Sequence, residues 1–140
     1  MTKNITSLLI LFCVTCFSDF VIAAPDNYFD TAKGKKFYEE ATALYQKIER
    51  ESAFTAQVNG VSIGYLDFGP KEGMPLIWVH GPGGTGYEML NVRDGLIKAG
   101  YRVIAIDVRG HGKTRITDYN ISVYDVADDI AGLMDYLHIS

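Results

Sequence analysis

The chain has 140 residues and a mass of 15.5 kDa, and 48% of its residues are hydrophobic while 21% are charged. This length and composition are typical of one globular domain and exclude a disordered or fibrous protein. The 13 basic and 17 acidic residues leave a net charge of −4. Because no basic run could neutralise a row of phosphates, we expect no nucleic-acid partner.

The first 23 residues, 1–23, have the pattern of a secretory signal peptide. Lys3 supplies a positive start, and a mostly apolar run from Ile5 to Phe17 follows it, which is too short for a stable membrane span. Val21-Ile22-Ala23 resembles the small-residue pattern of a cleavage site. We therefore predict cleavage after Ala23 and export of the remainder, to the periplasm or as a secreted protein, with no stable membrane span after cleavage. An uncleaved, membrane-anchoring helix remains the alternative.

Both cysteines, Cys13 and Cys16, lie inside this predicted signal peptide. A redox C-x-x-C pair needs a folded environment that activates one thiol, and a zinc site needs a second pair of ligands. A cleaved apolar segment offers neither, so we expect no disulfide, metal site or thiol chemistry in the exported chain.

Residues 24–52 are predicted to form an N-terminal amphipathic helical segment ahead of the main domain. Between Asp30 and Ser52, apolar side chains recur at steps of three and four residues, which is the spacing of an amphipathic helix. They are Phe37, Tyr38, Ala41, Leu44, Tyr45 and Ile48. We expect this face to pack on the chain's own domain.

Residues 53–140 are predicted to form an α/β domain. Asn59-Gly60 between two β-branched runs favours a tight antiparallel hairpin. The run from Pro75 to Val79 is continuously apolar, as expected of a strand buried on both faces. In chain order, we expect strands at 53–58, 61–68 and 75–79, a helix at 88–99, a strand at 101–107, and a helix at 122–138 that begins at a capping box of Ser122 and Asp125. An antiparallel hairpin followed by parallel strands with crossover helices forms a doubly wound α/β sheet.

Gly60-Val61-Ser62-Ile63-Gly64 matches G-x-S-x-G, the nucleophile-elbow pattern. That elbow is a strained turn between a buried strand and a helix. Here the motif lies in the predicted hairpin and no helix follows it, so we do not assign Ser62 as a nucleophile.

Gly81, Gly83 and Gly86 form a G-x-G-x-x-G motif between a predicted strand and a predicted helix, and Asp107 ends the next strand. In this context backbone N–H groups hold a pyrophosphate, and an acidic side chain accepts a hydrogen bond from a ribose hydroxyl. Two features argue against dinucleotide binding: the bulky His80 stands before the first glycine, and the strand pair ahead of the motif is antiparallel. A noncatalytic or dinucleotide-binding Rossmann-like module that uses these glycines and Asp107 remains the alternative function.

Two segments together resemble the α/β-hydrolase family: His80-Gly81-Pro82-Gly83-Gly84 and Asp107-Val108-Arg109-Gly110-His111-Gly112-Lys113-Thr114. Members of that family show an H-G-x-G type loop after the third strand and a D-x-R-G-x-G-x-S/T segment after the fourth, at similar spacing. The resemblance covers residues 55–140 and implies the N-terminal part of an α/β-hydrolase sheet. It implies an enzyme that hydrolyses an ester, amide or related bond in a small-molecule or peptide substrate, without a cofactor or a metal. With the predicted signal peptide, this enzyme is expected to be exported.

The resemblance also implies roles for the two segments. The family places a main-chain donor for the oxyanion in the loop after its third strand, which here means an oxyanion loop of Gly81, Gly83 and Gly84. Pro82 has no N–H, so Gly83 is the better candidate donor. Residues with an expected structural role are His80, Asp107, Arg109, Gly110 and Gly112.

Within the second segment, Asp107 and Arg109 are expected to fix the backbone of their own turn, and His111 is expected to be exposed or packed in that turn. In the family topology the third strand lies between the fourth and a fifth. The resemblance therefore places residues 75–79 at an open edge of the sheet.

In this family a further strand, a G-x-S-x-G elbow, an acid and a histidine come next, in that order. None of them follows the last predicted helix before Ser140. We therefore expect no catalytic residue within these 140 residues and interpret the sequence as the N-terminal portion of a hydrolase, truncated before the nucleophile elbow. A fragment, a frameshift and a natural short product would all give this sequence.

Overall fold

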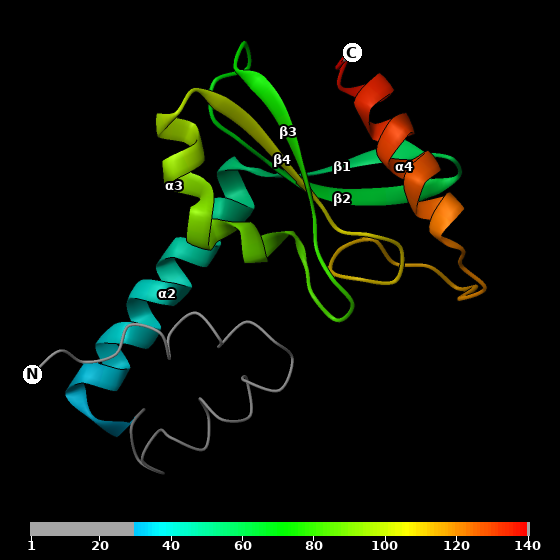
Figure 1. Cartoon of the computed structure of the whole chain (residues 1–140). Helices are drawn as coiled ribbons and strands as arrows, with labels where there is room; N and C mark the ends of the chain where they lie inside the picture. The colour runs from blue at the N-terminus through cyan, green and yellow to red at the C-terminus, as the bar shows by residue number, and fades with distance from the viewer. Residues whose placement is uncertain (1–29, 140) are drawn as a thin grey trace, which may run out of the picture. The chain divides into compact units, whose positions relative to one another are not determined.

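The computed structural model describes residues 30–139, and the chain divides into two compact units, residues 1–46 and 47–140. In chain order the elements are α2 (Ala32–Glu51), β1 (Ala53–Val58), β2 (Val61–Phe68), β3 (Met74–Val79), the 3-10 helix η3 (Gly86–Met89), α3 (Leu90–Lys98), β4 (Tyr101–Ile106) and α4 (Val123–Tyr136) (Figure 1). The predicted signal peptide, with Cys13 and Cys16, lies outside the described residues. Cleavage after Ala23 therefore stays a prediction.

α2 covers most of the segment in which the sequence predicts a helix. Phe37, Tyr38 and Tyr45 of the predicted apolar stripe are exposed. Ile48, in the last turns of the helix, is buried with residues of β2 and β4. Packing of the earlier part of the stripe on the domain stays a prediction. None of the helices between residues 30 and 139 is both long and apolar enough to cross a membrane.

β1 and β2 form the predicted antiparallel hairpin. Asn59 (φ +49°) and Gly60 (φ +77°) connect the strands, and two successive residues with positive φ are what the tightest hairpin turns require. β2 pairs antiparallel with β4, and β4 pairs parallel with β3. The four strands therefore form a mixed sheet in the order β1-β2-β4-β3.

β3 occupies the edge of the described sheet. The edge position implied by the family resemblance is confirmed, whereas the expectation of burial on both faces from Pro75 to Val79 is wrong, because Pro75 is exposed and Val79 is 44% exposed. β4 has a similar apolar run but lies between β2 and β3, and it is buried from Val103 to Ile106. An apolar run does not by itself place a strand within the sheet, because strand order depends on the connections between strands.

Alternate residues of β4 point to opposite faces of the sheet, and each face has its own core. Ile104 and Ile106 pack with β1, β2 and Leu133 of α4. Val103 and Ala105 pack with η3 and α3 on the other face. α4 and α3 therefore cover opposite faces of the sheet (Figure 1), as an α/β layered domain requires.

The predicted helix at 88–99 forms in two pieces, η3 and α3, and begins earlier than expected. The Thr85 hydroxyl caps η3 by accepting the N–H of Tyr87. Gly86 lets the first turn lie against β4, since a Cβ at this position would be 2.9 Å from the carbonyl oxygen of Ala105. The start of the helix is thus set by a close approach to the sheet that the apolar spacing does not show.

α4 begins at the predicted capping box, which is confirmed. The Ser122 hydroxyl accepts the N–H of Asp125, and the Asp125 carboxylate accepts the N–H of Ser122 at 2.7 Å. Hydrogen bonds from the side chain and backbone of Ser122 hold the pKa of Asp125 below its ordinary value. The two side chains together satisfy N–H groups that a helix start leaves without partners.

Candidate active site

Two loops lie side by side at one end of the parallel strand pair. Val79 at the end of β3 pairs with Ile106 at the end of β4, so the segments that follow the two strands leave the sheet together. We call residues 80–86 the glycine loop and residues 107–114 the Asp107 loop. The carboxyl ends of parallel strands are where α/β proteins place their ligand-binding and catalytic groups.

His80 joins the two loops from the glycine-loop side. Its side chain is buried, with the residue 7% exposed. Nδ1 donates to the carbonyl of Gly81 at 2.8 Å, and Nε2 accepts the N–H of Val108 at 3.1 Å. This pattern of partners requires the neutral tautomer with its proton on Nδ1. The ring braces the glycine loop and has no unoccupied nitrogen with which to accept a substrate proton.

His111 makes the reverse connection from the Asp107 loop. Its Nε2 accepts the N–H of Gly83 at 3.3 Å, and its Nδ1 donates to the carbonyl of Arg109 at 3.1 Å. Its ring centroid lies 4.9 Å from that of His80. Sequence reasoning treated His111 only as a turn residue, because nothing local reveals that it meets a glycine 28 positions earlier.

Asp107 ties the Asp107 loop to the start of η3. The residue is 6% exposed, and its carboxylate accepts the N–H of Gly86 at Oδ1 and that of Lys113 at Oδ2, each at 2.8 Å. Gly112 leaves room for this carboxylate, because a Cβ at Gly112 would lie 2.1 Å from Oδ2. Asp107 is thus an acceptor for the main chain, and two N–H donors hold its carboxylate in place.

Thr114 is a structural residue that the sequence analysis did not single out. It is fully buried, donates to the carbonyl of Asp107 at 2.6 Å and accepts the N–H of Gly64 at 2.8 Å. Gly64 lies directly against the loop, since a Cβ there would be 2.6 Å from the Cβ of Lys113. The second glycine of the elbow-like motif therefore serves the packing of the Asp107 loop on β2. The signal that could have identified Thr114 is the hydroxyl position that ends the D-x-R-G-x-G-x-S/T pattern.

Arg109 does not act with Asp107 on the backbone of the turn, contrary to the sequence expectation. Its guanidinium donates two hydrogen bonds to the carboxylate of Asp129 in α4, at 2.6 and 2.9 Å, and these bonds raise the pKa of Arg109. Asp129 is buried, so the pair attaches the Asp107 loop to α4. Gly110 follows with φ +77°, a conformation that glycine adopts without strain.

The glycine loop presents its main chain outward. Gly81, Pro82 and Gly83 are exposed, and Gly83 has φ +79° with open space where a side chain would begin. Of the three expected oxyanion donors, Gly84 uses its N–H inside the loop, donating to the carbonyl of Gly81 at 3.1 Å. The N–H of Gly83 is held by His111, an acceptor from outside the glycine loop.

The dinucleotide-binding hypothesis does not fit this geometry. It requires Asp107 to accept a hydrogen bond from a ribose hydroxyl, and a helix start whose N–H groups face a pyrophosphate. Both oxygens of Asp107 already accept main-chain N–H groups, and one of these belongs to Gly86, the third glycine of the motif. Asp107 is also only 6% exposed, so a ribose hydroxyl cannot reach its carboxylate, and we reject the use of Gly81, Gly83 and Gly86 as a dinucleotide site.

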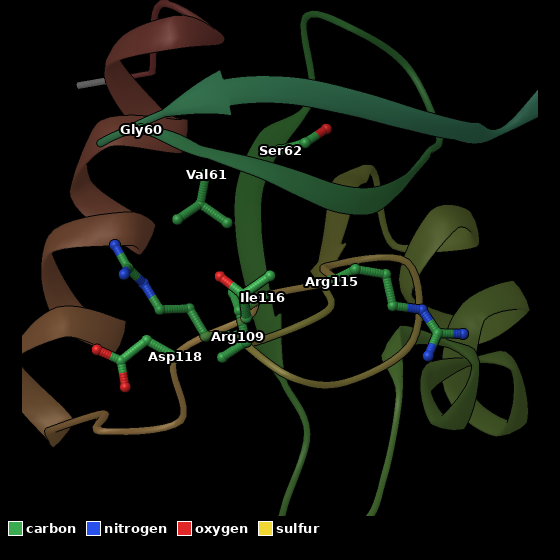
Figure 2. A pocket seen from close by; sticks show the side chains of 8 residues that line it. Gly60, Val61, Ser62, Arg109, Arg115, Ile116 and Asp118 are labelled. Carbon is green, nitrogen blue, oxygen red and sulfur yellow. The ribbon is translucent and has the colours of Figure 1, made fainter.

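Ser62 lies on β2 in the hairpin, where it lines a shallow hollow of about 290 Å³ (Figure 2). The other residues that line it are Gly60, Val61, Arg109, Arg115, Ile116, Thr117 and Asp118. In Figure 2 the guanidinium of Arg109 turns toward α4, and Arg115 points away from the hollow. None of these lining residues is a histidine that could act as a base for Ser62, and the strand does not turn into a helix. The elbow-like motif therefore does not form a nucleophile elbow.

The chain matches known proteins of one fold family. A family model described as the alpha/beta hydrolase fold matches residues 74–140. A non-heme chloroperoxidase from Streptomyces lividans is 35% identical over 83 residues, which is 58% of this chain and 29% of that protein. A magnesium-chelatase 30 kDa subunit from Rhodobacter capsulatus is 33% identical over 92 residues, covering 65% of this chain and 32% of that protein.

Comparison with solved structures points to the same fold family. The crystal structure of an epoxide hydrolase from Vigna radiata superposes with a TM-score of 0.57 at 28% sequence identity, over 62% of this chain and 28% of that chain. The chain spans 29% and 32% of the lengths of the two curated relatives described above. The mixed sheet, the paired loops and these similarities together show that the chain has the α/β-hydrolase fold.

Proposed function

We propose that this chain provides the oxyanion-binding part of an α/β-hydrolase active site, with the glycine loop as the donor. The observation that carries the proposal is the outward-facing main chain of Gly81 to Gly83, braced from within by the buried His80. Backbone N–H donors held in place before the reaction stabilise the charge that develops on a carbonyl oxygen during acyl transfer. Glycines suit such a loop because they let the reacting group approach the backbone closely.

The Asp107 loop supports the proposal because it gives the glycine loop a rigid neighbour. Asp107 and Thr114 are buried and hydrogen-bonded to main-chain groups of the loop and of β2. An oxyanion donor is effective only when its position changes little during the reaction, and buried, satisfied polar networks provide such rigidity.

The substrate we propose is a small molecule or peptide with an ester, amide or related bond that the enzyme hydrolyses. Names of similar proteins include a bifunctional esterase/perhydrolase, a haloalkane dehalogenase and epoxide hydrolases. The proteins with these names have the same fold but act on different kinds of substrate. They therefore support a class of reaction for this chain and not one particular substrate.

The proposal is tested by reading the coding DNA beyond codon 140 in all three frames and by expressing the product that it encodes. We expect a buried strand and a G-x-S-x-G elbow, and hydrolysis of p-nitrophenyl acetate by that longer product. The 140-residue chain by itself should stay at the background rate, because an oxyanion donor needs a nucleophile to act with. Turnover by the 140-residue chain that disappears in Ser62→Ala would overturn this assignment.

The role of the loop is tested in the longer product by two substitutions of one glycine. Asn adopts positive φ much more readily than a β-branched residue does. Gly83→Asn should therefore retain most of the activity, whereas Gly83→Val should lower kcat by about 100-fold, the loss typical of one missing oxyanion donor. Gly60→Val is the matched control, because Gly60 also has positive φ and open space but lies in the hairpin turn. Equal kcat values for Gly83→Asn and Gly83→Val would contradict the proposal.

We also propose that the chain is exported and that the mature protein begins at Ala24. The support is the sequence of residues 1–23, with Lys3, an apolar run and small residues at the predicted cleavage site. N-terminal sequencing of the exported fraction should give Ala24. An intact Met1 in that fraction would contradict the prediction.

A further inference from the structure

The two histidines of the site connect the two loops in opposite directions. His80 of the glycine loop accepts the N–H of Val108 in the Asp107 loop, and His111 of the Asp107 loop accepts the N–H of Gly83 in the glycine loop. In each ring, the second nitrogen donates to a carbonyl of the ring's own loop. Each loop is therefore held by an acceptor that the other loop supplies.

The two acceptor bonds differ in length and in exposure. The bond from Val108 to His80 measures 3.1 Å and involves a buried ring, whereas the bond from Gly83 to His111 measures 3.3 Å and is exposed. Both acceptors are imidazole nitrogens, so the two lengths can be compared directly, and the Gly83 bond is the longer and the more exposed of the two. A neutral ring nitrogen at that distance is a weaker acceptor than a negatively charged oxygen. An oxyanion could therefore replace His111 as the partner of Gly83.

We propose that His111 is a positioning residue for the oxyanion donor: its Nε2 holds the Gly83 N–H in place in the unliganded protein and releases that N–H to the oxyanion of the substrate. The inference rests on the proposed function of the glycine loop. Gly83 has the wide conformational freedom of glycine, and its φ is +79°. An acceptor that occupies the N–H before the substrate arrives removes much of that freedom, which is what preorganisation of a donor requires.

The proposal needs His111 in one tautomer, neutral with the proton on Nδ1. The carbonyl of Arg109 can only accept a hydrogen bond, so the Nδ1 that faces it at 3.1 Å must carry the proton. His80 cannot deliver a proton to Nε2 of His111, since both nitrogens of His80 are engaged with backbone groups. Measuring which nitrogen of His111 carries the proton therefore tests the proposal directly.

The first experiment measures that tautomer in the unmodified, full chain. Long-range proton–nitrogen spectra of the isotope-labelled protein report which ring nitrogen of each histidine carries the proton. We expect His111 to carry it on Nδ1, as His80 does. A proton on Nε2 of His111 would overturn the proposal, because that nitrogen could not then accept the Gly83 N–H.

The second experiment compares two substitutions at position 111. His111→Phe keeps a flat ring without nitrogens, and His111→Gln supplies an amide oxygen as a replacement acceptor. We expect hydrogen exchange of the Gly83 amide to be about fivefold faster in the Phe variant, the factor that corresponds to one ordinary hydrogen bond, and to return toward the wild-type rate in the Gln variant. The amide of Val108 should keep its rate, and so should Gly83 in the control His138→Phe. An unchanged Gly83 rate in His111→Phe would overturn the proposal.

Failure of this inference and failure of the proposed function give different results. In the longer product, His111→Phe should lower kcat for p-nitrophenyl acetate with little change in KM, and His111→Gln should recover part of the loss. If Gly83 exchange responds to His111→Phe but the longer product hydrolyses no ester, the proposed function is wrong and the contact between the two residues stands. If the longer product is active but neither the Gly83 exchange nor kcat responds, the role of His111 is wrong.

Discussion

The loops that follow β3 and β4 are neighbours in space, but they are held in different ways. The Asp107 loop leaves an interior strand, and its anchors Asp107 and Thr114 are buried and hydrogen-bonded on several sides. The glycine loop leaves the edge strand and is exposed from Gly81 to Gly83. The difference shows how a rigid support and an accessible binding element can be built side by side, since buried polar networks rigidify a segment and exposed main chain can meet a ligand.

The largest effect is expected from removing the anchor of the Asp107 loop. Asp107→Ala leaves the buried N–H of Gly86 and the partly buried N–H of Lys113 without their acceptor, which should lower the free energy of unfolding by about 3–5 kcal/mol. Urea unfolding, followed by the fluorescence of the single tryptophan, Trp78, measures this loss. Asp107→Asn keeps one acceptor oxygen, so its free energy of unfolding should lie between those of the wild type and Asp107→Ala. A loss below about 1 kcal/mol for Asp107→Ala would contradict the supporting role of this loop.

A matched pair of glycine substitutions tests the contrast between the loops directly. Gly112 (φ +48°) and Gly83 (φ +79°) both have positive φ, but a Cβ at Gly112 would lie 2.1 Å from Asp107 Oδ2, while a Cβ at Gly83 meets nothing within 4 Å. Gly83→Ala should therefore cost only the backbone strain, about 1–2 kcal/mol. Gly112→Ala should cost about 2 kcal/mol more, because it also displaces the buried carboxylate. Equal losses in urea unfolding would mean that the two loops are packed alike.

Acid should unfold the domain through a carboxylate on β2 that lies in neither loop. Burial tends to raise the pKa of Asp67, but hydrogen bonds from Arg102 and Lys71 outweigh this effect and lower the pKa overall. A carboxyl whose pKa is lower in the folded state stabilises the fold above its unfolded pKa, and that contribution is lost as the pH falls through the folded pKa.

We therefore expect the urea midpoint of the wild type to fall more between about pH 7 and about pH 3 than that of Asp67→Asn. Hydrogen exchange should show that the stability lost at low pH is lost throughout the domain and not only in the glycine loop. If the urea midpoint decreases equally in the wild type and in Asp67→Asn, Asp67 does not cause the acid sensitivity.

The smallest effect is expected at the edge strand that carries the glycine loop. An apolar edge strand presents unpaired backbone groups on which other chains can pair, and a charge placed there discourages such pairing. Met74→Lys at the exposed start of β3 should reduce light scattering of the concentrated chain, with little change in unfolding free energy. Val123→Lys on α4 is the matched control, because Val123 is also largely exposed (76% against 68% for Met74), and it should not reduce scattering. If both substitutions reduce it alike, net charge rather than the edge is responsible.

Several elements of this fold could be predicted from neighbouring residues alone. Asn59-Gly60 tolerates the positive φ of a tight turn, and Ser122 with Asp125 satisfies the first N–H groups of α4. Each of these interactions spans only a few positions, so the residue types at those positions are sufficient to specify it. The family resemblance, carried by the two loop segments, added the edge position of β3.

The sequence by itself thus determined the hairpin, the order of strands and helices, and the two loops that form the candidate site. Only the tertiary structure decided the partners: Arg109 meets Asp129 twenty positions later, Gly83 meets His111 across 28 positions, and Gly64 meets Thr114 across 50. Local conformation follows from the sterics and hydrogen bonds of adjacent residues. The partner of a polar side chain instead depends on which distant segments the packed sheet brings within hydrogen-bonding distance, and a buried group must find one there.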